Sequence, residues 1–197
     1  MQELQPDQIA LLSFSAGLAI IKTIETLIPE LIAIPMLKWP NDVLIHDRKV
    51  SGILCEMRSS LPKTAIVGIG LNLAATFEKS VLDTGANPIS LHEVAAIVPD
   101  DLTVLKCLRQ CLLRQVNATD SPIDSPTDSP IDSQSRIEQV RSRDALYGRP
   151  IEFEQPNGQQ ITGIGRGIST KGELLIEGTD GQITPYQSGR VLRWELT

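Results

Sequence analysis

The stretch Met36–Ile45, MLKWPNDVLI, places a lysine directly before Trp-Pro-Asn-Asp, with apolar runs on either side. A lysine that emerges from a hydrophobic strand is costly to keep there unless an anionic group meets it. Lysine carries a compact point charge that suits carboxylate or phosphate oxygens, and the proline that follows fixes the direction of the chain. We therefore predict that Lys38 ends a strand at an anion-binding site.

Apolar runs separated by polar turns continue on both sides of this stretch. They predict four strands: Ile32–Lys38, Val43–Ile45, Val50–Met57 and Thr64–Leu71. A helix buried on much of its surface is predicted over Ile9–Ile28, and leucines at helical spacing predict another over Asp101–Val116. The first part of the chain is therefore expected to have an α+β fold.

The character of the sequence changes after residue 117. Thr119–Gln134 reads TDSPIDSP followed by TDSPIDSQ, a Ser/Pro/Asp-rich duplication that cannot build a core. From Leu146 onward, glycine turns separate short apolar runs at intervals typical of a small SH3-like β-barrel. We expect a first α+β domain at 1–117, a linker at 118–138 and a β domain at 139–197.

Composition narrows the class of protein further. The chain has 197 residues, is 41% hydrophobic and 21% charged, and carries a formal net charge of −6. Such a chain can bury a substantial core, and it has no basic field that would favour nucleic acid. The start of the chain lacks a signal-peptide pattern, and Lys22 and Glu25 interrupt the most apolar segment. We expect a cytoplasmic protein that binds neither membrane nor nucleic acid.

Three segments combine an apolar strand with a polar or glycine feature: Lys38–Asp42, Lys49–Glu56 and Val67–Asn72. Glycines inside strands let a flat ligand or another backbone approach closely, and an asparagine offers both a donor and an acceptor. Each feature also has a structural interpretation. Lys38 could extend from a strand end into water, and the Gly68-x-Gly70 pair could mark a bulge rather than a dinucleotide site.

Taken in order, these segments resemble the biotin–protein ligases. The resemblance rests on KWPND, on KVSGIL-x-E, on VGIGLN and on the β domain introduced by RDALYGRP. It implies a catalytic domain similar to class II aminoacyl-tRNA synthetases and lipoate ligases, with an SH3-like domain after it. It also implies a reaction in which biotin and ATP give biotinyl-5′-AMP, and the biotinyl group then passes to a lysine of a carboxyl carrier protein, such as that of acetyl-CoA carboxylase.

The resemblance implies a role for each matching residue. Lys38 would be the catalytic cation beside the biotin carboxylate and the α-phosphate. Gly52, Ile53 and Leu54 would line the biotin pocket. The nucleotide would lie near Trp39 and Asn72, and Mg²⁺ would accompany the ATP phosphates near Asp42.

One element of the family pattern is not found in this sequence. The Arg- and Gly-rich loop that covers the adenylate in the family precedes the first helix there, whereas Arg48 is the first arginine here. We therefore expect an N-terminally truncated ligase domain, open to dimerisation through an exposed sheet edge. Two other hypotheses remain. One is a non-catalytic module, or half of a split ligase, that docks the carrier protein or a separate N-terminal fragment. The other is a lipoate- or octanoate-handling transferase.

Overall fold

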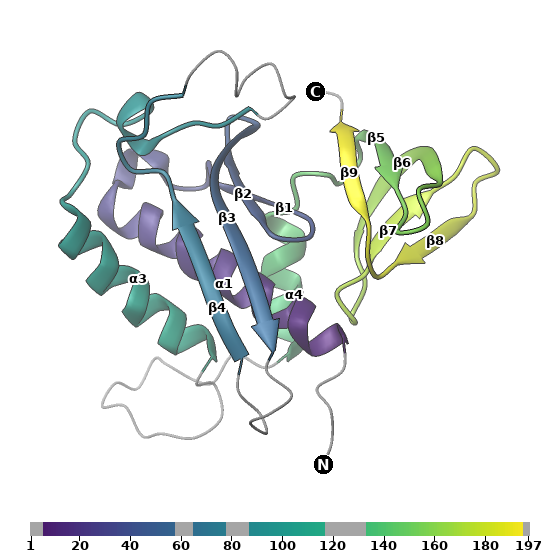
Figure 1. Ribbon diagram of the computed structural model, residues 1–197, viewed down its shortest axis with the longest axis horizontal. Coiled ribbons are helices and arrows are strands. Elements are labelled where there is room, and N and C mark those ends of the chain that lie inside the picture. The colour runs from purple at the N-terminus through teal and green to yellow at the C-terminus, as the bar shows by residue number, and fades with distance from the viewer. Residues whose placement is uncertain (1–5, 58–64, 78–86, 117–132, 195–197) are drawn as a thin grey trace.

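The computed structural model describes residues 6–57, 65–77, 87–116 and 133–194 of the 197-residue chain (Figure 1). A part built from helices and a four-stranded sheet comes first, and a small part with a five-stranded sheet follows it. The two parts lie side by side, with the small β part next to the β1 end of the first sheet. The mixed α+β class predicted from the sequence is confirmed.

The first sheet is antiparallel throughout, and its strands follow chain order. They are β1 (Met36–Lys38), β2 (Asp42–Ile45), β3 (Arg48–Met57) and β4 (Ala65–Leu71). The apolar runs after residue 42 therefore predicted three strands to within two residues at each end. Among the described strands, β4 comes last in the sheet order and pairs with β3 on one side only.

The predicted strand Ile32–Lys38 is too long, because only its last three residues pair in the sheet. A 3-10 turn, η1 (Pro29–Leu31), comes before it, and Ala33 has φ = 65°. That left-handed conformation is incompatible with a strand. The Ala33 N–H donates to Glu25 Oε1 at 2.9 Å, which holds the bend in place.

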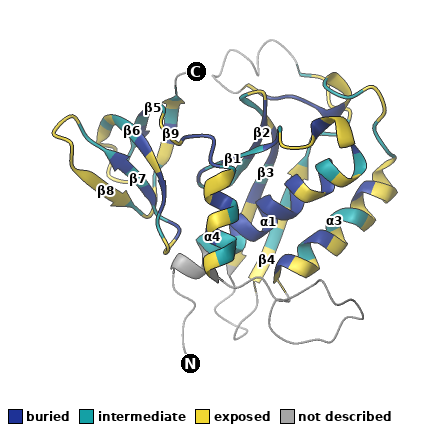
Figure 2. Cartoon of the chain, turned by 180° about the vertical axis from the view of Figure 1, so that it is seen from behind, coloured by how far each residue is buried: buried dark blue, intermediate teal, exposed yellow. Residues whose placement is uncertain are grey.

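Helix α1 (Pro6–Leu27) runs through the centre of the core (Figure 2). It packs against the sheet, chiefly β3, and against α3 (Asp101–Val116). By length and composition alone, the segment Ala10–Leu27 could cross a membrane. In the structure most of this segment is buried by the sheet and α3, as predicted for a core helix.

Helix α3 has the predicted bounds, but only part of its leucine stripe faces the core. Leu102 and Leu105 are 57% and 61% exposed. The side chains that turn inward are instead Val104, Leu108 and Cys111, with Leu112 beside them. Leucine spacing thus predicted the helix correctly, whereas packing against α1 determined which side is buried.

The predicted linker 118–138 is too long at its C-terminal end. Residues 133–138 belong to α4 (Ser133–Ser142), whose Ile137 and Val140 are buried. The helix packs against α1 and the second sheet, and this burial stabilises a helix that the polar sequence did not predict. The rest of the predicted linker, and most of the Ser/Pro/Asp duplication, lies outside the described residues.

The C-terminal part is a five-stranded antiparallel sheet in the order β8-β7-β6-β5-β9. Its strands are β5 (Pro150–Glu154), β6 (Gln160–Ile168), β7 (Leu174–Glu177), β8 (Ile183–Tyr186) and β9 (Arg190–Trp194). Glycines with positive φ lie in its turns, at Gly158, Gly172, Gly181 and Gly189, as the turn pattern predicted. This architecture is compatible with the predicted SH3-like barrel.

The two parts share one continuous core at their junction. Leu37 of β1 accepts the Ala145 N–H at 2.8 Å and donates its own N–H to Arg143 O at 2.6 Å. Arg149 forms an ion pair with Asp47 at 2.6 Å between Nη1 and Oδ1. These contacts fix the small β part against the β1 edge, beside the stretch that contains Lys38.

Candidate active site

Lys38 lies at the end of β1, in a row of paired residues that crosses all four strands of the first sheet. In this register Lys38 faces Asp42, Asp42 faces Gly52, and Gly52 faces Gly70. Residues paired across antiparallel strands share a face of the sheet. The neighbouring row begins with Leu37 and Val43, which are 4% and 0% exposed in the core. The Lys38 row therefore lies on the face that α1 does not cover.

Asp42 forms ion pairs with two lysines. Its Oδ2 lies 3.3 Å from Lys38 Nζ, and its Oδ1 lies 2.6 Å from Lys49 Nζ. The side chains of Lys38 and Asp42 are only 14% and 13% exposed, while that of Lys49 is 47% exposed. Two ammonium groups and one carboxylate leave a net positive charge in a partly dehydrated place, and such a site favours an anionic ligand.

Gly52 gives this cluster the space that it needs. A Cβ placed on Gly52 would lie 3.0 Å from Lys49 Cε and Nζ and 3.7 Å from Asp42 Oδ1. Any larger residue would push into the Lys49–Asp42 pair. Gly68 and Gly70 on β4 are exposed, so the sheet surface beyond Gly52 consists largely of backbone. A flat ligand could approach this surface closely.

Trp39 lies behind Lys38 at the junction of the two parts. Its indole is 3% exposed, and its Nε1–H donates to Gly172 O at 3.1 Å. The ring also packs against Phe153, with a centroid distance of 5.9 Å. This arrangement fixes the direction in which Lys38 leaves the strand. The predicted nucleotide contact would have to use the part of the indole that faces the neighbouring cavity.

A cavity of about 270 Å³ opens beside Trp39 and includes two of the predicted biotin-binding residues, Ile53 and Leu54. Leu54 is 61% exposed, and Ile53 is buried. Asn41 fixes the position of Ile53 in the cavity wall. Its side-chain Nδ2 donates to Ile53 O at 2.7 Å, and its backbone carbonyl accepts the Ile53 N–H at 2.9 Å. The C-terminal part contributes residues 187–189 to the rim. The size is close to the lower limit for small-molecule pockets, roughly 300 Å³.

Cys55 also lines this cavity, but it has the properties of a packing residue. Burial raises the pKa of its thiol, so the thiol stays protonated at neutral pH. A protonated thiol is a poor nucleophile. Covalent catalysis at this position has no support, and the cavity wall is apolar here.

Asn72 lies just after β4, where it binds the backbone. Its Nδ2 donates to Lys49 O at 3.3 Å and to Ile89 O at 3.1 Å. The backbone carbonyl oxygen of Asn72 accepts the Leu91 N–H at 2.9 Å. A capping box formed by Ser90 and Glu93 opens the short η2 turn (Leu91–Glu93) that follows. Asn72 therefore attaches the segment 87–91 to the end of the sheet, and the structure does not place it in the Lys38 cluster.

Asp42 fits its predicted role as a magnesium ligand poorly. Both of its oxygens face lysine ammonium groups, which repel a divalent cation. Within the described residues, no group of three or more His, Cys, Asp or Glu side chains could hold a metal ion. In this geometry Asp42 positions the two lysines.

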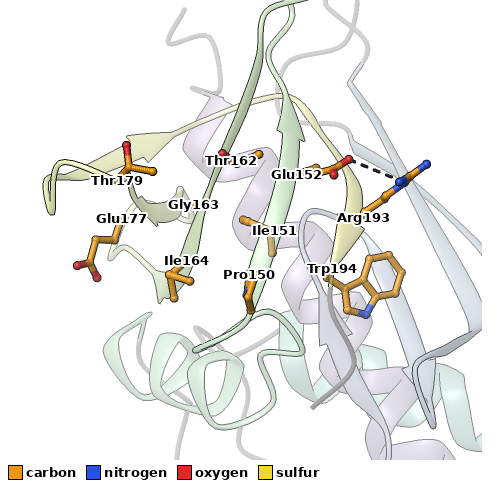
Figure 3. A pocket seen from close by; sticks show the side chains of 11 residues that line it. Pro150, Ile151, Glu152, Thr162, Gly163, Ile164, Glu177, Thr179, Arg193 and Trp194 are labelled. Carbon is orange, nitrogen blue, oxygen red and sulfur yellow. Dashed lines mark ion pairs between the residues drawn. The ribbon is translucent and has the colours of Figure 1, made fainter.

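Two residues of the site were missing from the sequence-based prediction. Lys49 could have been suspected from the KVSG spacing after the β2–β3 turn, because that hairpin brings it back toward Asp42. No feature of the sequence around Trp194 indicated that it belongs to the site. Its ring lies over Lys38, with the ammonium nitrogen 4.7 Å from the ring centroid. Trp194 also borders a cavity of about 560 Å³ on the C-terminal part (Figure 3).

Both parts of the chain match known protein families. Residues 1–72 match the Biotin/lipoate A/B protein ligase family, and residues 146–194 match the Biotin protein ligase C terminal domain. The chain is 30% identical over 181 residues to the biotin–[acetyl-CoA-carboxylase] ligase of Mycobacterium tuberculosis. It is 34% identical over 157 residues to the bifunctional ligase/repressor BirA of Escherichia coli. These alignments cover 92% and 78% of this chain, respectively.

Solved structures show the same likeness. The biotin protein ligase of Aquifex aeolicus superimposes with a TM-score of 0.73 at 25% identity, covering 96% of this chain and 76% of that chain. A structure of the same enzyme in complex with biotin and ATP gives a TM-score of 0.72 at 24% identity, which supports the fold. The present chain spans 61% of the length of the M. tuberculosis ligase and 44% of that of E. coli BirA.

Proposed function

We propose, because the chain belongs to the biotin protein ligase family, that it carries the adenylation centre for ATP-dependent attachment of biotin to a carrier protein. Biotin and ATP would form biotinyl-5′-AMP and pyrophosphate, and the biotinyl group would pass to a lysine of a biotin carboxyl carrier protein. The observation that carries this proposal is the partly buried Lys38, oriented by Asp42 on the uncovered face of the sheet. A cytoplasmic location is part of the same proposal.

The chemistry of adenylation suits a fixed cation at this place. The biotin carboxylate attacks the α-phosphorus of ATP, so two anionic groups must approach each other. Negative charge on the phosphoryl oxygens must also be stabilised in the transition state. Lys38 is held by Asp42 before any ligand arrives, so its ammonium needs little reorganisation. Lys49, on the other side of Asp42, adds a second positive charge at the same end of the sheet.

The surroundings of Lys38 suit the two substrates. The apolar wall formed by Ile53 and Leu54 would accept the hydrocarbon parts of biotin, and its carboxylate end would extend toward the Lys38 ammonium group. The nucleotide would lie toward the end of β4 near Asn72, with Trp39 supporting the floor between them. Mg²⁺ would enter with the ATP phosphates and neutralise part of their charge.

The test is a biotin-transfer assay on the 197-residue chain. The protein is mixed with ATP, Mg²⁺, biotin and a carboxyl carrier domain, and the carrier mass is read by mass spectrometry. Gain of one biotinyl group in the wild type, and a loss of about 10²–10³-fold in rate for Lys38→Ala, is the expected result. Lys106→Ala, which removes an exposed lysine on α3, is the matched control. Equal rates in the Lys38 and Lys106 variants would refute the role of Lys38.

A second candidate function is that of a partner-dependent half of a ligase. It is favoured by the edge position of β4, whose one partner among the described strands is β3. It is also favoured by Leu54 and Ile66, which are 61% and 43% exposed on the uncovered face. A further strand or segment could cover this edge and face. Transfer activity that appears only after adding a fragment with the Arg- and Gly-rich loop of a relative would support it. Activity of the chain alone would exclude it.

A further inference from the structure

Lys38 is enclosed by residues from both parts of the protein. Asp42, on its own sheet, faces one side of the ammonium group at 3.3 Å. The indole of Trp194, on the last described strand of the C-terminal part, lies over it at 4.7 Å from the ring centroid. A cation at this distance is attracted by the negative face of an aromatic ring. This contact explains in part how the Lys38 side chain stays 14% exposed at the edge of a sheet.

The indole of Trp194 has a second feature that packing alone does not require. Its Nε1–H is buried and finds no acceptor among the described residues. Trp39, the other tryptophan of the chain, does have an acceptor at Gly172 O. An unpaired buried N–H is unfavourable unless a ligand supplies the acceptor. The Trp194 donor belongs to a ring that covers the proposed catalytic ammonium group.

Other residues of β9 do not share this arrangement. Arg193 points toward Glu152, with 3.8 Å between Nε and Oε2, and its side chain is 81% exposed (Figure 3). Register places Arg193 opposite Glu152 and Trp194 opposite Ile151, so the two neighbours lie on opposite faces of the sheet. The contact with Lys38 is therefore specific to position 194.

We propose that Trp194 is a positioning residue of the adenylation site, which covers the Lys38 ammonium group and offers its indole N–H to an oxygen of the anion held there. The inference rests on the proposed function, and it adds that the C-terminal part completes the site. The oxygen belongs to a carboxylate or to a phosphate. Biotin and ATP added separately tell these two sources apart.

Chemical labelling of lysines tests whether Trp194 covers the Lys38 ammonium group, and it does not require the protein to be active. Acetylation of each lysine is followed by mass spectrometry in the wild type, Trp194→Phe, Trp194→Leu and the control Arg193→Ala. Trp194→Leu should raise the labelling rate of Lys38 severalfold, while Trp194→Phe, which keeps a ring, should raise it less. The exposed Lys22 and Lys106 serve as internal references. Unchanged Lys38 labelling in Trp194→Leu would overturn the proposal.

Fluorescence tests the indole N–H. In Trp39→Phe, Trp194 is the only tryptophan of the chain, and its emission is followed while biotin, biotin methyl ester or ATP is added. A change with biotin but not with its methyl ester assigns the acceptor to the carboxylate, and a change with ATP alone assigns it to phosphate. Binding without any change in emission would overturn the donor role.

Adenylation kinetics separate this role from general stability. Trp194→Phe lacks the indole N–H donor. It should therefore raise the KM of the ligand that supplies the oxygen by roughly tenfold. Trp194→Leu should lower kcat as well, because Lys38 loses its orientation. Equal melting temperatures for both variants exclude unfolding as the cause. A wild-type protein that binds neither biotin nor ATP would refute both the proposed function and the donor role of Trp194. The labelling rate of Lys38 would still show whether the Trp194 ring covers the Lys38 ammonium group.

Discussion

Asp42 Oδ2 lies 3.3 Å from Lys38 Nζ, directly across the β1–β2 ladder, and both side chains are more than four-fifths buried. The other oxygen of the same carboxylate meets Lys49 at 2.6 Å. One acidic side chain therefore keeps two ammonium groups at the end of the sheet. Its removal would leave two ammonium groups close together, one of them largely buried, without the carboxylate between them.

Asp42→Asn is expected to lower the free energy of unfolding by about 1–3 kcal/mol, between the values for exposed and for buried ion pairs. Urea unfolding at neutral pH measures this change, with an unchanged m-value as a check that the folded state stays compact. The matched control is Glu154→Gln, which breaks the exposed pair with Arg190 and should change stability by less than about 0.5 kcal/mol. Equal losses in both variants would contradict the assigned role of Asp42.

The ion pair between Asp47 and Arg149 joins the two parts across a turn with unusual backbone angles. Asp47 has φ = 58°, and His46 before it has φ = 50°. Asp47→Ala and Asp47→Gly both remove the ion pair, but only glycine adopts this conformation without steric cost. Asp47→Gly should therefore be more stable than Asp47→Ala by about 1 kcal/mol, measured by urea unfolding. The opposite order would show that the turn rearranges.

Asp144 gives stability a specific pH dependence. Burial raises the pKa of its carboxyl to about 6, although the Leu146 N–H and the charge of Arg149 act in the opposite direction. Because the folded protein holds the proton more tightly than the unfolded chain, this group stabilises the fold below about pH 4. That contribution is lost as the pH rises to about 6 and above.

The matching variant is Asp144→Asn, which keeps an oxygen for the Leu146 N–H and carries no charge. It should be more stable than the wild type above pH 6, by up to about 3 kcal/mol, and no more stable than the wild type at pH 4. Unfolding by urea at several pH values between 4 and 8 measures both curves. Parallel curves for the two proteins would mean that Asp144 is not the titrating group.

Gly17 marks the closest approach of α1 to the sheet. A Cβ at this position would overlap Leu37 Cδ2 and would lie 3.5 Å from Ile53 Cδ1. Alanine favours the helix by about 1 kcal/mol over glycine, whereas overpacking a core costs about 1–3 kcal/mol. We expect Gly17→Ala to be destabilising by about 1 kcal/mol overall, measured by thermal or urea unfolding.

A double-mutant cycle tests the cause of that loss. With Leu37→Val in the background, Gly17→Ala should cost less than it does in the wild type, because the shorter side chain leaves room for the added methyl group. An equal cost in both backgrounds would show that the strain lies elsewhere.

The elements that sequence predicted best are those whose signals are local. The bounds of α3, β3 and β4 follow from runs of apolar residues, and glycine turns a few positions apart indicated the short strands of the C-terminal part. Ile32–Lys38 failed as a strand because Glu25 on α1, eight residues before Ala33, holds Ala33 in a left-handed turn that the apolar run does not reveal. The extent of α4 was missed because its stability comes from burial of two side chains against other elements.

Residue type and order along the chain already marked Lys38 and the glycines of β3 and β4 as candidates for chemistry. Their arrangement in space came from the packed fold. It placed Asp42 between two lysines, used Asn72 to hold a backbone segment, and brought Trp194 over Lys38 from the far end of the sequence. The reason is physical: strand and turn preferences depend on neighbouring residues, whereas the surroundings of a charge depend on whichever side chains the packed core brings to it.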